Sequence, residues 1–322
     1  MSMHKLAIIC AALSALLFTA PVRATFPGQN GKIVFVSDRS GSWQLYTIDP
    51  DGRGMTQITN MPPTDYDLWA PTFSPDGGRI AFCYGTGNSA VFALAELYMI
   101  NADGTGLKQL THDGGFDCFP HWSPDGNHIA FFGSFPPAGS LAVMRSDGTD
   151  VQLLLTTGQW KFWGALFSTY TPDGRSIVFE SQFGGLVSAA WIMNSNGTHP
   201  QRLTPAPLEA TPVDVSPDGM HILINNHFNT DLPSATFVMD IDGKNLKPIF
   251  SPAENAHEGP GGYSPDGKKI ILMSDRLNSP FTFDIFTMNA DGTDLTRIAA
   301  AVGSCPDTGN CIDASWGPKP SN

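Results

Sequence analysis

Short apolar runs alternate along the chain with turns rich in Gly, Asp and Pro, and this alternation recurs at a fixed spacing. The clearest copy begins with an aromatic residue at Phe73, continues as Ser-Pro-Asp-Gly, and leads into a second apolar run from Arg79 to Tyr84. The Ser or Thr of this turn stands at positions 74, 123, 171, 216 and 264, so successive copies are 49, 48, 45 and 48 residues apart. A period of this size indicates a propeller or a solenoid.

A second turn, Asp-Gly or Asn-Gly, follows each apolar run and leads into a short β-prone segment. Gly, and to a lesser degree Asn and Asp, tolerate positive φ, so these dipeptides are strong hairpin signals. In the first turn, Pro presets φ and Gly accepts the conformation that closes the turn. Each repeat therefore predicts four antiparallel strands, which make one propeller blade. At 90–100, Ala, Leu and Glu would also suit a helical turn, but the repeat assigns that segment to a loop and a strand.

The number of turns predicts six blades. The chain has six Asp-Gly-type turns but five Ser-Pro-Asp-Gly-type turns, and the missing inner strand is supplied by residues 313–318, which keep Trp316. Near the other end, the segments 32–36, 44–48 and 55–59 make a blade that lacks its first strand. We therefore predict an all-β fold, a six-bladed β-propeller closed by N-terminal strands plus one C-terminal strand. Closure of this kind leaves no open edge in the ring.

The first 24 residues have the features of a signal peptide. Lys5 precedes an apolar run from Leu6 to Ala20, and the small residues Val22 and Ala24 suit a cleavage site. The run is shorter than the roughly 20 residues that span a bilayer, although an uncleaved anchor is the alternative. We expect a signal peptide at 1–24, a propeller at 25–322, no membrane span in the mature chain, and a periplasmic or secreted location.

The formal net charge is −12. An acidic surface disfavours nucleic acid and anionic lipid, whose phosphates require a basic footprint. It leaves cationic partners and metal ions open, although solubility is the simpler explanation. We expect a monomer with a protein partner and no nucleic acid.

Export would leave four cysteines, an even number in an oxidising compartment, which indicates disulfides. Cys305 and Cys311 bracket a turn-forming segment, so we expect them to pair. Cys83 and Cys118 would then pair if the fold brings them together. The chain contains no Cys-x-x-Cys, so neither a redox motif nor a zinc cluster is indicated.

The repeat resembles the TolB-type β-propeller repeat, a relative of WD repeats found in bacterial envelope proteins. The matching elements are the aromatic-Ser-Pro-Asp-Gly turn, an apolar strand, an optional Ser-Asp-Arg, a Tyr/Phe-x-Met-Asn-x-Asp-Gly segment and a Leu-Thr strand. Ser37-Asp38-Arg39 and Ser274-Asp275-Arg276 keep the middle element, and the match runs from Gly31 to Pro318. The resemblance does not extend to the N-terminal α/β domain of TolB or to the catalytic domain of prolyl oligopeptidase-like peptidases. It implies a propeller of the bacterial cell envelope.

Acidic residues occur in the loops that enter the inner strands. In a four-stranded blade these loops surround the mouth of the central channel, opposite the two Gly-containing turns. Several acids there would bind Ca²⁺, which prefers oxygen ligands, or a basic partner segment. Ordinary solvated loop acids are the simpler alternative. The candidates are Asp65, Asp67, Asp117, Glu209, His257, Glu258 and Asp313.

Histidines and aromatic residues offer further candidates. His121 and His257 are candidate metal ligands, because propeller lyases acting on acidic sugars use His-rich metal sites at such a mouth; packing or surface roles are the alternative. Trp160, Phe162 and Trp163 break the repeat beside Lys161 and are candidate partner contacts, with local packing as the alternative. In contrast, aromatic residues that recur at one repeat position are expected in the core. These are Trp122, Tyr170, Tyr263 and Trp316.

Three functional hypotheses follow. The chain has no Gly-x-Ser-x-Gly elbow, no His-Glu-x-x-His and no nucleotide-binding loop, which argues against a familiar hydrolase or nucleotide-binding enzyme. We therefore expect a non-catalytic protein- or ligand-binding scaffold of the bacterial envelope. The alternative is a metal-assisted lyase or hydrolase acting on a glycan at the channel mouth. A third hypothesis is a structural envelope protein held by a partner near residues 160–163.

Overall fold

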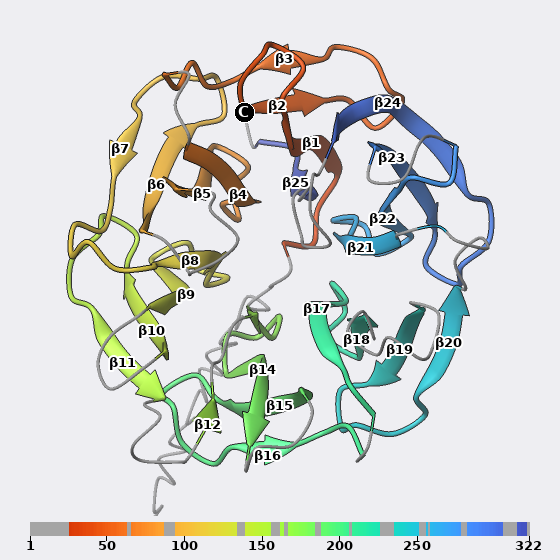
Figure 1. Ribbon diagram of the computed structural model, residues 1–322. Coiled ribbons are helices and arrows are strands. Elements are labelled where there is room, and N and C mark those ends of the chain that lie inside the picture. Colours follow the sequence, from red (N-terminus) through yellow and green to blue (C-terminus); the bar gives the residue numbers. More distant parts are fainter. Residues whose placement is uncertain are drawn as a thin grey trace, which may run out of the picture.

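The strands form a ring of six sheets (Figure 1). The computed structural model describes residues 26–62, 66–86, 94–133, 139–155, 162–163, 167–183, 188–205, 208–225, 235–250, 256, 258–277, 282–304 and 314–320. Within these ranges every regular element is a strand. The expected signal peptide and the pair Cys305 and Cys311 lie outside the described residues. The prediction of an all-β, six-bladed propeller is confirmed.

Each blade has four antiparallel strands, ordered from the inner to the outer position. The first three blades are β25 (Ala314–Pro318), β1 (Asn30–Ser37), β2 (Gln44–Ile48), β3 (Thr56–Gln57); β4 (Tyr66–Phe73), β5 (Arg79–Thr86), β6 (Ala95–Asn101), β7 (Lys108–Gln109); and β8 (Cys118–Trp122), β9 (His128–Gly133), β10 (Ser140–Arg145), β11 (Gln152–Leu155). The last three are β13 (Ser168–Tyr170), β14 (Ser176–Phe183), β15 (Ala189–Asn194), β16 (Gln201–Arg202); β17 (Thr211–Val215), β18 (His221–Asn225), β19 (Thr236–Asp240), β20 (Lys247–Phe250); and β21 (Glu258–Tyr263), β22 (Lys269–Ser274), β23 (Thr282–Asn289), β24 (Thr296–Ser304).

Blade 4 carries an additional short strand, β12 (Phe162–Trp163), which pairs with the end of β14. The segment that could have been a helical turn is strand β6 from Ala95 onward.

We call the face with the Ser-Pro-Asp-Gly and Asp-Gly turns the turn face. The opposite face, with the loops that enter the inner strands, is the mouth face.

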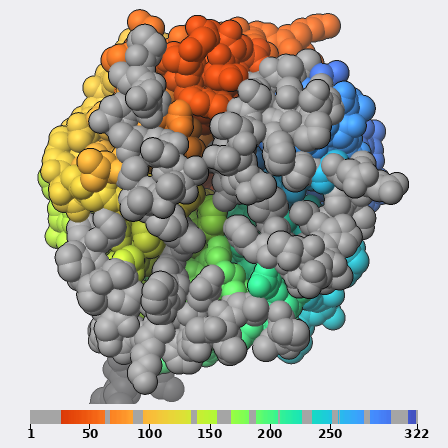
Figure 2. Space-filling model, viewed as in Figure 1, coloured from red at the N-terminus to blue at the C-terminus, as the bar shows by residue number. Residues whose placement is uncertain are grey.

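Blade 1 joins the two ends of the chain, as predicted. Strand β25 pairs with β1, with Ile33 opposite Trp316 and Phe35 opposite Ala314. The indole N–H of Trp316 donates to the carbonyl of Gly31 at 3.2 Å. In the space-filling view the first red sector of the ring adjoins the last blue one (Figure 2). The ring is therefore closed by backbone pairing between strands from opposite ends of the chain.

The Ser-Pro-Asp-Gly turn is held by its own side chains. Asp76 accepts hydrogen bonds from the Ser74 hydroxyl at 2.5 Å and from the Gly78 amide at 2.9 Å, and Ser74 Oγ accepts the Arg79 amide at 2.9 Å. Partial burial acts to raise the pKa of Asp76, but these hydrogen bonds hold it below its usual value. The same Ser/Thr-to-Asp hydrogen bond occurs in the other four copies of the turn.

The Asp-Gly turns require glycine for two reasons. Gly52 has a φ of +82°, and a Cβ added to it would lie 2.6 Å from the carbonyl oxygen of Ile298 on the outer strand of the neighbouring blade. The residue two positions after the turn glycine also has positive φ in all six blades, which the sequence pattern did not indicate. Only residues tolerant of this conformation stand there: Gly54, Gly106, Asp150, His199, Asn245 and Asp294.

Apolar side chains fill the spaces between neighbouring blades. The four aromatic residues expected in the core are buried there, with exposed fractions of 0% for Trp122, 5% for Tyr170 and Tyr263, and 6% for Trp316. A disulfide also joins Cys83 on β5 to Cys118 on β8, so it links blades 2 and 3. The predicted pairing of these two cysteines is therefore confirmed.

Candidate functional site

The described mouth acids are distributed over several blades. Asp67 is half-buried on β4, Asp117 is fully buried just before β8, Glu209 is half-buried before β17, and Glu258 is buried at the start of β21. Asp65, His257 and Asp313 lie outside the described residues. Of the four described acids, Asp117 alone belongs to a group of three potential metal ligands within the part of the chain that the structure describes.

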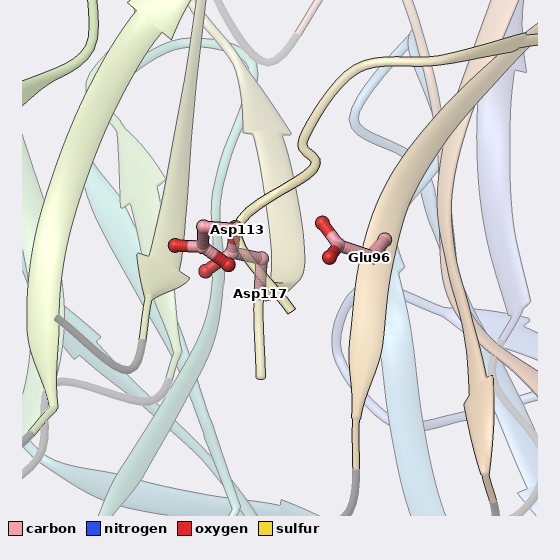
Figure 3. Close-up of side chains that lie close together, drawn as sticks. All are labelled: Glu96, Asp113 and Asp117. Atoms are coloured by element: carbon pink, nitrogen blue, oxygen red, sulfur yellow. The ribbon is translucent and has the colours of Figure 1, made fainter. Parts of the chain in front are cut away.

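Asp117 lies beside two acids that were not among the sequence candidates. One carboxylate oxygen each of Glu96, Asp113 and Asp117 lies within 4.8 Å of the others. Figure 3 shows the three side chains close together, with Glu96 on β6 and the two aspartates on the segment between β7 and β8. Three carboxylates offer the oxygen ligands that Ca²⁺ and Mg²⁺ prefer. Asp113 could have been identified from the sequence, because it stands four residues before Asp117. Glu96 could not, because only the register of β6 places it beside the two aspartates.

Glu96 also has a structural role. Its carboxylate accepts the Thr111 hydroxyl at 2.5 Å and the Gly114 amide at 2.8 Å. Gln44 has the same place in blade 1, where it accepts the Thr59 hydroxyl and the Met61 amide, both at 2.8 Å. An uncharged side chain thus makes equivalent hydrogen bonds one blade away, so the position of Glu96 is explained without a metal ion. Binding of Ca²⁺ at the mouth stays a prediction.

Glu258 forms an ion pair inside blade 6. Its Oε1 accepts hydrogen bonds from Arg276 Nε at 2.6 Å and from the Ser274 hydroxyl at 2.5 Å. The Arg276 guanidinium also lies over the ring of Phe250, 5.0 Å from its centroid. In this copy of the Ser-Asp-Arg element the Arg therefore folds back over the blade and covers a buried carboxylate, whereas Arg39 of the other copy lies over the rings of Phe35 and Tyr46.

Replacing Arg276 with Met is expected to lower the free energy of unfolding by about 3 kcal/mol, because Glu258 would keep a buried charge without its cation. Urea unfolding measures the change. The double variant Arg276→Met with Glu258→Gln is the control, since it removes the uncompensated charge and should recover much of the loss. An unchanged urea midpoint in Arg276→Met would contradict the structural role.

His121 connects blades 3 and 4. Its Nε2 lies 3.2 Å from the Thr169 hydroxyl on β13, and its Nδ1 lies 3.4 Å from the Trp122 carbonyl. Burial lowers the pKa of His121 to about 4, so the ring is neutral at neutral pH. It belongs to no group of three potential metal ligands among the described residues. These contacts give His121 a structural role, and a metal shared with His257 stays untested.

Glu209, which is half-buried, lies near a buried acid that was not among the sequence candidates. Glu180 on β14 is 4% exposed, and its Oε2 accepts the Thr211 hydroxyl at 3.1 Å. Burial raises the pKa of Glu180, and the charge of Glu209 acts in the same direction. The charge of Glu209 therefore adds to burial in disfavouring the ionised form of Glu180 at the junction of blades 4 and 5.

The candidate partner contact has a defined backbone position. Phe162 pairs with Phe183 and Trp163 with Gln182, at the mouth-face end of β14. Trp160 lies outside the described residues. The described residues also contain no helix that is long and apolar enough to cross a bilayer.

Comparisons with known proteins agree with this architecture. Residues 61–223 match the family model described as the TolB beta propeller domain. A TolB homologue from Chlorobium chlorochromatii is 31% identical over 150 residues, which are 47% of this chain and 31% of that protein. The chain thus spans about a third of the length of this relative.

Two solved structures share the fold. TolB from Acinetobacter baumannii superposes with a TM-score of 0.71 at 19% identity, over 92% of this chain and 69% of that one. A putative TolB from Agrobacterium tumefaciens superposes with a TM-score of 0.61 at 19% identity, over 91% of this chain and 99% of that one. On the family match, which covers half of its length, and on its six closed blades, the chain belongs to the TolB β-propeller domain family.

Proposed function

We propose that this protein is a non-catalytic binding scaffold of the bacterial periplasm or cell surface, which holds a partner protein on its mouth face. The observation that carries the proposal is strand β12. Backbone pairing with β14 fixes Phe162 and Trp163 at the mouth-face end of blade 4, as a fifth strand added to the regular four. A short aromatic segment held in this way suits a preorganised protein contact.

The candidate reactive groups contact other residues of the protein itself, and this supports a binding scaffold rather than an enzyme. Glu258 is paired with Arg276, His121 contacts Thr169, and Glu96 holds the segment that follows β7. Each of these groups stabilises a blade or a junction between blades. A metal-assisted lyase or hydrolase would instead need such groups to converge on a substrate.

The proposed location follows from features of both the sequence and the fold. Residues 1–24 have the pattern of a signal peptide, and a buried disulfide joins blades 2 and 3. Disulfides persist in oxidising compartments such as the periplasm. Membership of the TolB propeller family also favours an envelope protein, whose partner would be another envelope protein.

The test is capture of a partner by the full chain expressed with its leader. Cross-linking in the cell, followed by mass spectrometry, should identify an envelope protein joined to the wild type. The triple variant Trp160→Ser, Phe162→Ser, Trp163→Ser should lose most of this product, through roughly a tenfold loss of affinity. The control Leu107→Ser, Met220→Ser removes exposed apolar side chains elsewhere and should keep it.

Equal capture by the triple variant would overturn the assigned contact. Turnover of a glycan or peptide that is lost on replacing Asp117 or Glu209 would overturn the non-catalytic function itself.

A further inference from the structure

A cavity of about 520 Å³ lies between blades 3 and 4 on the turn face. Its walls combine an aromatic residue and aliphatic side chains with acids at the turns. The lining includes Tyr170, Val143, Leu154, Asp125, Asp150 and Asp173. The described lining includes none of the mouth acids and neither residue of β12, and the cavity lies on the opposite face from the contact proposed above.

Between blades 2 and 3, the corresponding space holds a side chain of the protein itself. Arg79, the first residue of β5, places its guanidinium carbon 4.6 Å from the centroid of the Trp122 ring. Trp122 has the same repeat position in blade 3 as Tyr170 has in blade 4. The protein therefore contains its own example of a guanidinium lying over the inner-strand aromatic residue of the next blade.

Between blades 3 and 4, the residue in the place of Arg79 is His128, which is too short to do the same. A Cβ added at Gly126 would lie 3.9 Å from Arg79 Nη2. At the equivalent Gly174, such an atom would meet Pro124 and no atom of His128 within 4 Å. The place of the guanidinium is thus open in this gap, consistent with the cavity there.

The charge of the cavity suits a cation. Its described lining includes three aspartates and neither Lys nor Arg. Asp125 accepts hydrogen bonds from Ser123 and Asn127, and Asp173 accepts them from Thr171 and Arg175. Partial burial acts to raise the pKa of Asp125, but its hydrogen bonds hold it below its usual value. Asp150 lies 3.5 Å from Arg145 Nε, and Arg175 Nε lies 3.8 Å from Asp173, but the two arginine side chains are 59% and 85% exposed.

We propose that this inter-blade cavity, defined by Tyr170, His128 and the three aspartates, binds an arginine side chain of a partner protein. The guanidinium takes the place over Tyr170 that Arg79 takes over Trp122. Val143 and Leu154 contact its aliphatic stem, and the aspartates at the turns balance its charge. A planar guanidinium fits this arrangement better than a lysine ammonium, because it stacks on a ring and donates to carboxylates at once.

The test uses the peptide acetyl-Gly-Gly-Arg-Gly-Gly-amide, titrated into the full chain and followed by NMR at the amides of Gly174 and Asn196. The matched peptide with citrulline has the same shape without the charge. We expect saturable shifts with the arginine peptide and roughly tenfold weaker binding of the citrulline peptide, since charged hydrogen bonds are about twice as strong as neutral ones.

Two variants localise the binding. His128→Arg should abolish it, because the new side chain occupies the cavity as Arg79 occupies the preceding one. His221→Arg makes the same change at the same repeat position of blade 5 and should bind the peptide like wild type. Asp150→Asn should weaken binding about threefold or more without backbone strain, since Asn tolerates the φ of +57° found there.

Equal affinity for the citrulline peptide would overturn the proposal, as would wild-type affinity in His128→Arg. Unaltered affinity in Asp150→Asn would do the same, and this variant serves if His128→Arg fails to fold. None of these peptide measurements depends on the partner contact proposed at residues 160–163. Failure of that contact would therefore not change how they are interpreted.

Discussion

Replacing Trp316 with Ala is expected to lower the free energy of unfolding by about 3–5 kcal/mol, the usual cost of truncating a buried aromatic side chain. Trp316 is 6% exposed on the single strand that the C-terminal segment contributes to blade 1. It belongs to the same buried cluster as Ile33 of blade 1 and Ile271 of blade 6, so the change removes packing between these two blades at the closing strand. Urea unfolding followed by tryptophan fluorescence and circular dichroism measures the loss.

The matched control is Trp122→Ala, which removes the same side chain at the same repeat position of blade 3. Both variants should lose stability, but only Trp316→Ala should release the closing strand. Hydrogen exchange at the amides of Val34 and Phe35, opposite Ser315 and Ala314, should therefore be faster in Trp316→Ala than in Trp122→Ala. Equal exchange in the two variants would show that the ring does not open first at blade 1.

The fold was predictable because the backbone of each blade is specified by local turn chemistry. Ser74 and Asp76 form their hydrogen bonds within a single short turn, and the same pattern recurs in the other copies. A correct prediction of the strands in one repeat therefore predicts the strands in the others. The number of turns also revealed the closing strand β25. The pairing of Cys83 with Cys118 was expected on the assumption that export leaves four cysteines and that Cys305 pairs with Cys311, which is close to it in sequence.

The candidate site was less predictable, because its contacts depend on strand register and on side chains distant in sequence. The sequence identifies Asp117 as a loop acid, but its neighbour Glu96 belongs to a strand whose register only the fold defines. The sequence also suggests Glu258 as a mouth ligand, and nothing in it indicates that Arg276 covers this carboxylate. The pairing of β12 with β14 likewise has no signal in the repeat, since it departs from it.

The disulfide between Cys83 and Cys118 is expected to contribute about 4 kcal/mol to the free energy of unfolding. The two cysteines are 35 residues apart, and the chain-entropy relation gives this value for a loop of that length. Because the crosslink joins the second strand of blade 2 to the inner strand of blade 3, it restricts the unfolded chain across a blade boundary. The double variant Cys83→Ala, Cys118→Ala should show the loss as a lower urea midpoint.

Reduction separates the crosslink from the packing of the two buried sulfur atoms. Wild type in a strong reductant keeps both side chains, so it should lose most of the stability that the double variant loses, and the remainder is packing. The variant Cys305→Ala, Cys311→Ala, measured oxidised and reduced, controls for the second expected disulfide. A reduced wild type as stable as the oxidised protein would show that native packing between blades 2 and 3, not restriction of the unfolded chain, holds this boundary together.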